Sequence, residues 1–287
     1  VGVLGPWGCD PVLARALPEV ASRLAVSRLN RDPALSAGYW WDAAVLPEPC
    51  GTPQAVVGAL SAERYASGLV GPVNPAVCGA TALLAAAWNK PLVAWACAEG
   101  TGGATTLVNP LPEPAAILHA VLKFFRWAHV AVVAAPQDMW LEAAEEVAKG
   151  LRARGLPVTV VTAAGEDEEE AEEALRRVQR ADGVRVVVMC MHSVLLGGRE
   201  QRVLLEKAED LGMTDGTFVF IPYDALSFAL PYRRVPYPVL ANNTKLRLAY
   251  DAVLTITIDS PELSFHEALE EAKEAYEVPA HVDPAQV

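Results

Sequence analysis

The side chains that could perform chemistry are few and widely spaced in this sequence. His192 and Ser193 are adjacent at the end of the apolar run VRVVVMCM, but neighbours on a strand point to opposite faces and cannot easily serve one nucleophile. No G-x-S-x-G motif, which would expose a nucleophilic serine, is present. His119 and His129 have no partner at a spacing that suits a metal. We therefore expect no catalytic residue and no metal site, and a structural role for His192.

Two glycine-bearing loops invite a test for phosphate binding. The stretch GLVGPVNPAVC, residues 68–78, lacks the lysine of a phosphate-binding loop, and its two prolines remove backbone N–H donors. In the opening VGVLGPWG, Pro6 and Trp7 block the close approach that a pyrophosphate needs. We expect no cofactor in this chain.

The cysteines point to a crosslinked protein without fixing its crosslinks. There are five: Cys9, Cys50, Cys78, Cys97 and Cys190. Cys50 and Cys78 each follow a strand-like run, in loops rich in proline and glycine, where a bridge would stabilise the fold. Cys190 lies inside an apolar run and is typical of a core residue. Asn242-Asn243-Thr244 matches the N-glycosylation acceptor, which makes Asn242 a candidate for a glycan.

Aromatic side chains recur at the expected strand ends. Trp7, Trp95, Trp140 and Tyr223 lie at or just past such ends, where a ring can stack on a ligand or pack in the core. The stretch 195–198 could bind an anion on helix N–H groups or set a tight turn. Both alternatives stay open in each case.

The elements that would position these residues alternate between strands and helices. Apolar runs alternate with segments of helical periodicity, which is typical of parallel sheets covered by helices. The expected strands are 1–4, 40–46, 68–71, 91–97, 129–135, 156–163, 184–191, 217–224 and 252–258. Pro18 should kink the first long helix or mark its late start. A Gly/Thr stretch at 99–106 interrupts this alternation of strands and helices, so we predict two α/β lobes, 1–105 and 106–287.

Ligands of parallel sheets bind beyond the carboxyl ends of the strands. If the two lobes face each other across those ends, the loops there line a cleft. The candidate cleft-lining residues are Trp7, Asn74, Trp95, Asp138, Ser193, Tyr223 and Asp224.

Composition limits the class of protein. The 287 residues are 52% hydrophobic and 20% charged, which suits a large core. The net charge of −12 argues against a nucleic-acid partner, which would need clustered cations. No apolar run reaches the roughly 18 to 20 residues of a membrane span, and no leader opens the chain. We expect a soluble piece, processed or excised from something larger.

Several strings taken together resemble one family. VGVLGPWGCDP, SRLNRDP, LPEPC, SGLVGPVNPAVC, FRWAHVAVV, APQDMW, VVVMCMHSVLLGG and YDAVLTITI are similar to the extracellular domain of membrane (receptor) guanylyl cyclases. The likeness is to the retinal and olfactory sensory branch, and closest to the retinal members. It covers almost the whole chain in order. It implies a two-lobed type I periplasmic-binding-protein-like fold, C-terminally truncated, because the family continues with elements that complete the first lobe.

The resemblance also implies a setting and partners. The domain would lie on the extracellular or photoreceptor-disc lumenal side of a single-pass membrane protein, as a homodimer. It would contact the membrane only through missing parts of the parent. In this family a bridge joins the positions of Cys50 and Cys78. The natriuretic-peptide relatives hold a chloride where a cysteine follows the glycine at once, but Pro72 to Val77 intervene here, so the chloride is not carried over.

We therefore expect a receptor domain that acts in dimerisation and regulation rather than catalysis. The parent would convert GTP to cyclic GMP in sensory signalling, and a peptide or small-molecule ligand stays open. The alternatives are a soluble solute-binding protein of the same fold and an α/β enzyme with an unrecognised site. Tight binding of a small solute would favour the former, and turnover of GTP by this chain alone the latter.

Overall fold

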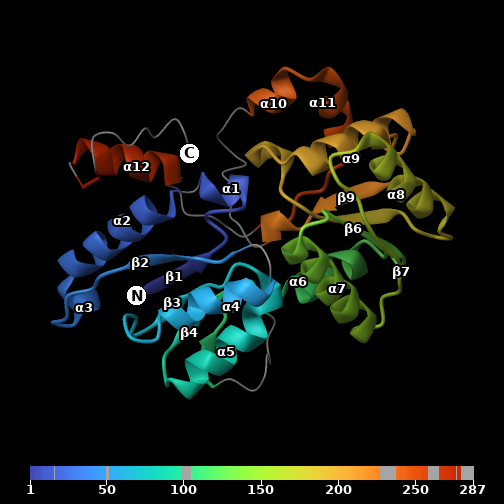
Figure 1. Ribbon diagram of the computed structural model, residues 1–287. Coiled ribbons are helices and arrows are strands. Elements are labelled where there is room, and N and C mark those ends of the chain that lie inside the picture. The colour runs from blue at the N-terminus through green and yellow to red at the C-terminus, as the bar shows by residue number, and fades with distance from the viewer. Residues whose placement is uncertain are drawn as a thin grey trace. The chain divides into compact units, whose positions relative to one another are not determined.

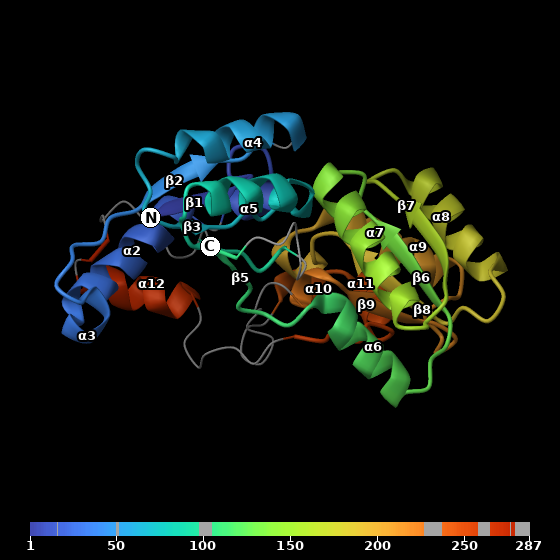
Figure 2. The same ribbon diagram turned by 90° about the horizontal axis from the view of Figure 1, so that it is seen from below.

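The chain forms two compact units. The computed structural model describes residues 1–15, 17–49, 52–97, 105–226, 237–257, 265–275 and 277–278. The first unit comprises Val1–Pro110 and Pro261–Val287, and the second comprises Leu111–Ser260. Each unit contains a parallel sheet with helices packed on it (Figures 1 and 2). The predicted α/β class with parallel sheets is confirmed.

The sheet of the first unit has five parallel strands in the order β2-β1-β3-β4-β5. The strands are β1 (Gly2–Gly5), β2 (Ala44–Pro47), β3 (Leu69–Val70), β4 (Leu92–Val93) and β5 (Leu107–Val108). Leu4, Leu69 and Leu92 are almost fully buried and form the centre of this unit's apolar core. Apolar runs that alternate with helices thus produce the parallel sheet that the sequence predicts.

The helices of the first unit begin at clear sequence signals. They are α1 (Pro11–Ala14), α2 (Pro18–Arg31), α3 (Pro33–Ser36), α4 (Thr52–Ser61), the 3-10 turn η1 (Pro75–Val77), α5 (Cys78–Ala87) and α12 (Phe265–Glu274). Pro18 occupies the first turn of α2, where its missing N–H would have had no helical partner. The predicted late start at Pro18 is confirmed.

Helix α12 corrects the predicted division of the chain. Leu269 and Ala272 of α12 are buried against Leu24 of α2, and Arg28 Nη2 lies 3.8 Å from Glu271 Oε2. The chain therefore returns to the first unit after the second, instead of running on in one lobe from 106 to 287. The break between residues 110 and 111 lies five residues beyond the predicted boundary between residues 105 and 106. The sequence of an amphipathic helix reveals an apolar face, but it does not reveal which sheet that face will cover.

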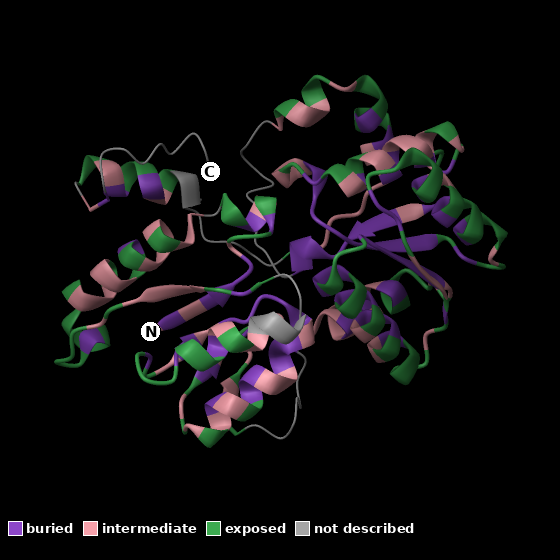
Figure 3. Ribbon diagram, in the orientation of Figure 1, coloured by how far each residue is buried: buried purple, intermediate pink, exposed green. Residues whose placement is uncertain are grey.

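The sheet of the second unit is parallel in the order β7-β6-β8-β9. Its strands are β6 (Val130–Ala134), β7 (Val158–Ala163), β8 (Val186–Cys190) and β9 (Val219–Pro222). Every residue of β6 and β8 is buried (Figure 3). The predicted strand 252–258 is reduced to one parallel bridge, between Val253 and Phe220, and Ile258 lies outside the described residues.

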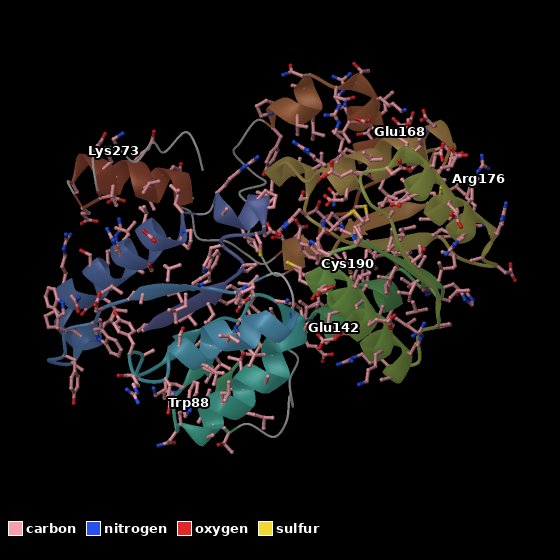
Figure 4. The ribbon with its side chains drawn as sticks, viewed as in Figure 1. Trp88, Glu142, Glu168, Arg176, Cys190 and Lys273 are labelled. Atoms are coloured by element: carbon pink, nitrogen blue, oxygen red, sulfur yellow. A yellow bond between two sulfur atoms is a disulfide. The ribbon has the colours of Figure 1, made fainter. Side chains whose placement is uncertain are left out.

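The helices of the second unit cover this sheet. They are α6 (Pro114–Phe124), α7 (Asp138–Ala153), α8 (Glu168–Arg180), η3 (Val194–Leu196), α9 (Arg199–Asp210), η4 (Asp224–Leu226), α10 (Pro238–Ala241) and α11 (Thr244–Tyr250). On α8, Leu175 and Val178 are buried, whereas Arg176, which Figure 4 labels, is exposed and pairs with Glu172. The acidic first turn of α8, which contains Glu168, Glu169 and Glu170, thus lies on a solvated helix face.

Candidate functional site

In the first unit a buried glutamate joins the loops at the carboxyl ends of the strands. Glu48 follows β2 directly, and its backbone N–H donates to the carbonyl of Gly5 at the end of β1, at 2.7 Å. Its side chain reaches across that strand, where Oε2 accepts from the backbone N–H of Asn74 at 3.4 Å. Glu48 is only 2% exposed, and its Oε1 has no hydrogen-bond partner among the residues that the structure describes. A single carboxyl group therefore ties the β2 and β3 loops together.

The environment of Glu48 disfavours its charge. Burial raises the pKa of Glu48 from its ordinary 4.5 to about 7, and the backbone N–H groups of Asn74 and Val73 oppose that rise. Among the described residues, no charged side chain contributes to the shift. Near neutral pH the protonated and the ionised forms of this carboxyl group are therefore present in similar amounts.

Asn74 and Trp7, two predicted cleft residues of this unit, have structural roles. The side chain of Asn74 is buried and caps η1, accepting from the Ala76 N–H at 3.0 Å. Trp7 packs its ring against Gly5, where any Cβ atom would overlap the ring. Trp95 follows β4, and the indole N–H groups of both Trp7 and Trp95 are buried and find no hydrogen-bond partner in the described part of the chain. These two donors and Glu48 Oε1 leave polar groups unsatisfied at one edge of the sheet, where a ligand or water could satisfy them.

The disulfide at this edge differs from the predicted one. Cys78, at the start of α5, is bonded to Cys97, with a Cα–Cα distance of 5.4 Å. The expected bond from Cys78 to Cys50 is therefore wrong, and Cys50 lies outside the described residues. The reason is topological: Cys78 and Cys97 follow β3 and β4, which are neighbours in the sheet. Cys9 is also disulfide-bonded, and Cys190 is a buried free thiol.

The second unit has a similar buried carboxyl group at the edge of the sheet where its strands end. Asp224 follows β9 closely, and its Oδ2 accepts from the backbone N–H of Ser193, after β8, at 2.6 Å. Asp224 is fully buried, and no described residue donates a hydrogen bond to its Oδ1. Burial raises the pKa of Asp224 to about 6, against the lowering effect of the Ser193 N–H and of His192. Both units therefore use a buried acid to join two strand-end loops.

Aromatic and polar side chains surround Asp224. Trp140 meets His192 edge to face at 4.8 Å and Tyr223 at 6.4 Å. Tyr250 is nearby, and burial followed by the charge of Asp224 raises its pKa to about 12, while the hydroxyls of Thr255 and Ser193 lower it. The side chain of Ser193 caps η3 through the Leu195 N–H at 3.2 Å. His192 therefore packs in the core, as predicted.

Sequence reasoning missed Glu48 and Gln201. Gln201 of α9 is fully buried, and its Oε1 accepts from the Val194 N–H at 2.9 Å. Glu48 had a usable signal, an acid between two prolines directly after a strand, whereas nothing in the sequence of α9 distinguishes Gln201 from a surface residue. Asp138 is exposed in the first turn of α7. The predicted cleft itself stays a prediction.

Asn242 is exposed at the C-cap of α10, where a glycan could be attached. The side chain of the neighbouring Asn243 is engaged in two hydrogen bonds. It accepts from the Leu246 N–H at 3.0 Å and donates to Glu206 at 2.6 Å. Among the described helices, none combines the length and the apolar content that crossing a bilayer requires.

Comparison with known proteins gives one consistent result. A model of the receptor family ligand binding region matches residues 17–287. Retinal guanylyl cyclase 2 of Bos taurus is 46% identical, and retinal guanylyl cyclase 1 is 52% identical in Bos taurus and 50% in Homo sapiens. Each similarity covers 100% of this chain and 26% of the relative, so the chain spans about a quarter of their length. The resemblance to retinal guanylyl cyclases that the sequence motifs indicated is confirmed.

Proposed function

This chain belongs to the receptor family of ligand-binding regions, which is periplasmic-binding-protein-like, and on that premise we propose that it is the extracellular or lumenal domain of a membrane guanylyl cyclase of the retinal kind. The similarity to retinal guanylyl cyclases along the whole chain carries this proposal. In the parent, the conversion of GTP to cyclic GMP belongs to segments outside this chain. The domain itself dimerises and biases that activity through its conformation.

An extracellular or lumenal position predicts a glycan on Asn242. We expect the chain made through a secretory route to carry N-linked sugar, because the acceptor asparagine is exposed between two short helices. Intact-mass measurement before and after glycosidase treatment checks this, with Asn242→Gln as the variant and Asn243→Gln as a neighbour that leaves an N-x-T acceptor intact. Chain that is secreted with a bare Asn242 would remove this support for the proposed location.

Helices α4 and α5 supply a face for a second copy of the chain. Neither helix contains a charged residue over its full length, and the two helices pack against each other. Val57, Leu60 and Leu83 are nevertheless 62%, 45% and 56% exposed. Exposed helices usually carry charged residues on their outer face. Because the whole chain has a charge of −12, an uncharged face is where two copies can approach with least repulsion.

Charge on this face should separate the copies. Leu83→Arg places a cation at the exposed centre of α5 and should raise the dissociation constant of the dimer by about tenfold or more, because a buried unpaired charge is costly. Sedimentation velocity over a concentration series measures this. Leu248→Arg on α11, which is 48% exposed in the wild type, is the matched control and should leave the dimer intact. A dimer unaffected by Leu83→Arg would place the interface elsewhere.

A further inference from the structure

Glu48 links the two chain segments that lead into α4 and α5. It follows β2 and precedes α4 in the chain. Its Oε2 accepts from the backbone N–H of Asn74, and the side chain of Asn74 caps η1, which runs directly into α5 at Cys78. A single buried carboxyl group therefore lies behind the uncharged surface of Val57, Leu60 and Leu83, which we call the α4–α5 face.

Close packing couples the position of Glu48 to both helices. Helix α4 passes so near the end of β2 that a Cβ atom on Gly58 would lie 2.5 Å from the carbonyl oxygen of Pro47, the residue before Glu48. Helix α4 also packs against η1 and α5. The bond from Cys78 to Cys97 fixes the first residue of α5. A shift of the Glu48 loop therefore changes the position of α4 relative to α5.

The described surroundings of Glu48 hold few other groups that could titrate. The strands β1 to β5, the helices α4 and α5 and the turn η1 contain no ionisable side chain, since Cys78 is disulfide-bonded. The loop after β1 contributes Cys9, which is disulfide-bonded and has its Sγ 3.7 Å from the Glu48 carbonyl. The same loop contributes Asp10, whose side chain caps α1. The α4–α5 face itself therefore has nothing to titrate, and the acid behind it does.

The two protonation states of Glu48 do not fit this space equally well. A neutral carboxyl group can remain dry with Oε2 bonded to the Asn74 N–H. An ionised one loses its hydration, and no cation of the described residues offsets that loss. Water must then reach the carboxylate, which separates the loops that it joins. Burial raises the pKa of Glu48 to about 7, so this change falls near neutral pH.

We infer that protonation of Glu48 regulates the pairing of two copies of the chain through the α4–α5 face. The inference rests on the proposed function, because it needs the dimer that this face is proposed to form. With a neutral Glu48, α4 and α5 keep the packing of this structure and Val57, Leu60 and Leu83 present one surface. With an ionised Glu48, the hydrated loop displaces α4 and the two copies fit less well. Each copy then associates through its neutral fraction, which lowers the apparent affinity in proportion.

Sedimentation velocity of the whole chain over a concentration series at pH 6 and pH 8 tests this. We expect the dissociation constant of wild type to be about tenfold higher or more at pH 8, because a group with a pKa of about 7 is about tenfold less protonated there. Glu48→Gln cannot ionise and should keep a tight dimer at both pH values. Glu63→Gln changes an exposed acid just after α4 and is the matched control, which should retain the pH dependence of wild type.

The comparison with Glu48→Gln also removes the effect of other groups, since the five histidines lose charge over the same range. Circular dichroism at both pH values shows whether each variant is folded. The same pH dependence in wild type and in Glu48→Gln overturns the inference and leaves the α4–α5 face intact. If Leu83→Arg does not weaken the dimer at pH 6, or if the chain is monomeric at both pH values, the face is wrong and the inference falls with it.

Hydrogen exchange provides a readout within a single copy. In the Leu83→Arg background, the amides of α4 and α5 should exchange faster at pH 8 with Glu48 in place than with Glu48→Gln, and equally fast at pH 6. Comparison at one pH cancels the intrinsic pH dependence of exchange. Equal exchange at pH 8 would show that ionisation does not displace α4, and the inference would be wrong even if the dimer forms.

Discussion

Replacing Cys78 and Cys97 together with alanine should lower the free energy of unfolding by about 3 kcal/mol. The bond crosses a sequence separation of 19, and a crosslink of that span restricts the unfolded chain by roughly this amount in the chain-entropy model. Alanine is the suitable replacement because both cysteines are almost fully buried in the apolar core of the first unit, where a serine hydroxyl would need a partner. Urea unfolding of the secreted chain measures the loss.

Two controls separate the crosslink from the loss of a buried sulfur atom. Cys190→Ala removes a buried free thiol and should cost about 1 kcal/mol, the effect of a small cavity. Peptide mapping without reduction should recover Cys78 joined to Cys97. A crosslinked peptide that joins Cys50 to Cys78, or a double variant as stable as Cys190→Ala, would contradict the structure.

The sequence indicates the strand ends but not the order of the strands. Cys78 and Cys97 both follow apolar runs, and this placement at a sheet edge is visible in the sequence. Their pairing depends on β3 and β4 being neighbours. Strand order is a tertiary property, because it is decided by which helices cover which face. A resemblance to other chains then transferred a pairing that this chain does not have.

The same limit explains α12 and the strand expected at 252–258. Helix α12 is a local element of ten residues, yet its contact with Leu24 joins segments at opposite ends of the chain. The run AVLTITI has strand propensity, but its described residues, 252–257, form a single bridge to the sheet, between Val253 and Phe220. Propensity thus predicts the local conformation, and packing decides the partner.

The candidate site shows how far residue types alone can lead. The rule for parallel sheets correctly places Asn74, Ser193 and Asp224 at carboxyl edges. It does not predict that the backbone N–H groups of Asn74 and Ser193 donate hydrogen bonds to buried carboxyl groups. A backbone donor has no sequence signature, because every residue except proline carries one. The two acid bridges therefore become visible only in the folded chain.

The stability of the chain should fall as the pH rises from 5 to 8, and Glu48 should account for much of that fall. Its pKa is about 7 in the folded chain and 4.5 ordinarily, so the folded state retains a proton that the unfolded state has lost. The stabilisation is full below pH 4.5 and disappears as the pH rises through 7. The shift corresponds to on the order of 3 kcal/mol. Asp224, with a pKa of about 6, contributes in the same direction.

Glu48→Gln tests this directly, because glutamine keeps the shape and the acceptor but cannot ionise. We expect the variant to match wild type near pH 5 and to exceed it by about 2 to 3 kcal/mol in unfolding free energy at pH 8. Glu63→Gln, which changes an exposed acid of the same unit, should retain the pH slope of wild type. If Glu48→Gln is instead less stable than wild type at pH 8, the charged carboxylate stabilises the two strand-end loops. The unpaired Oε1 would then have a partner in solution, and a cation at this edge of the first unit would be the group to search for.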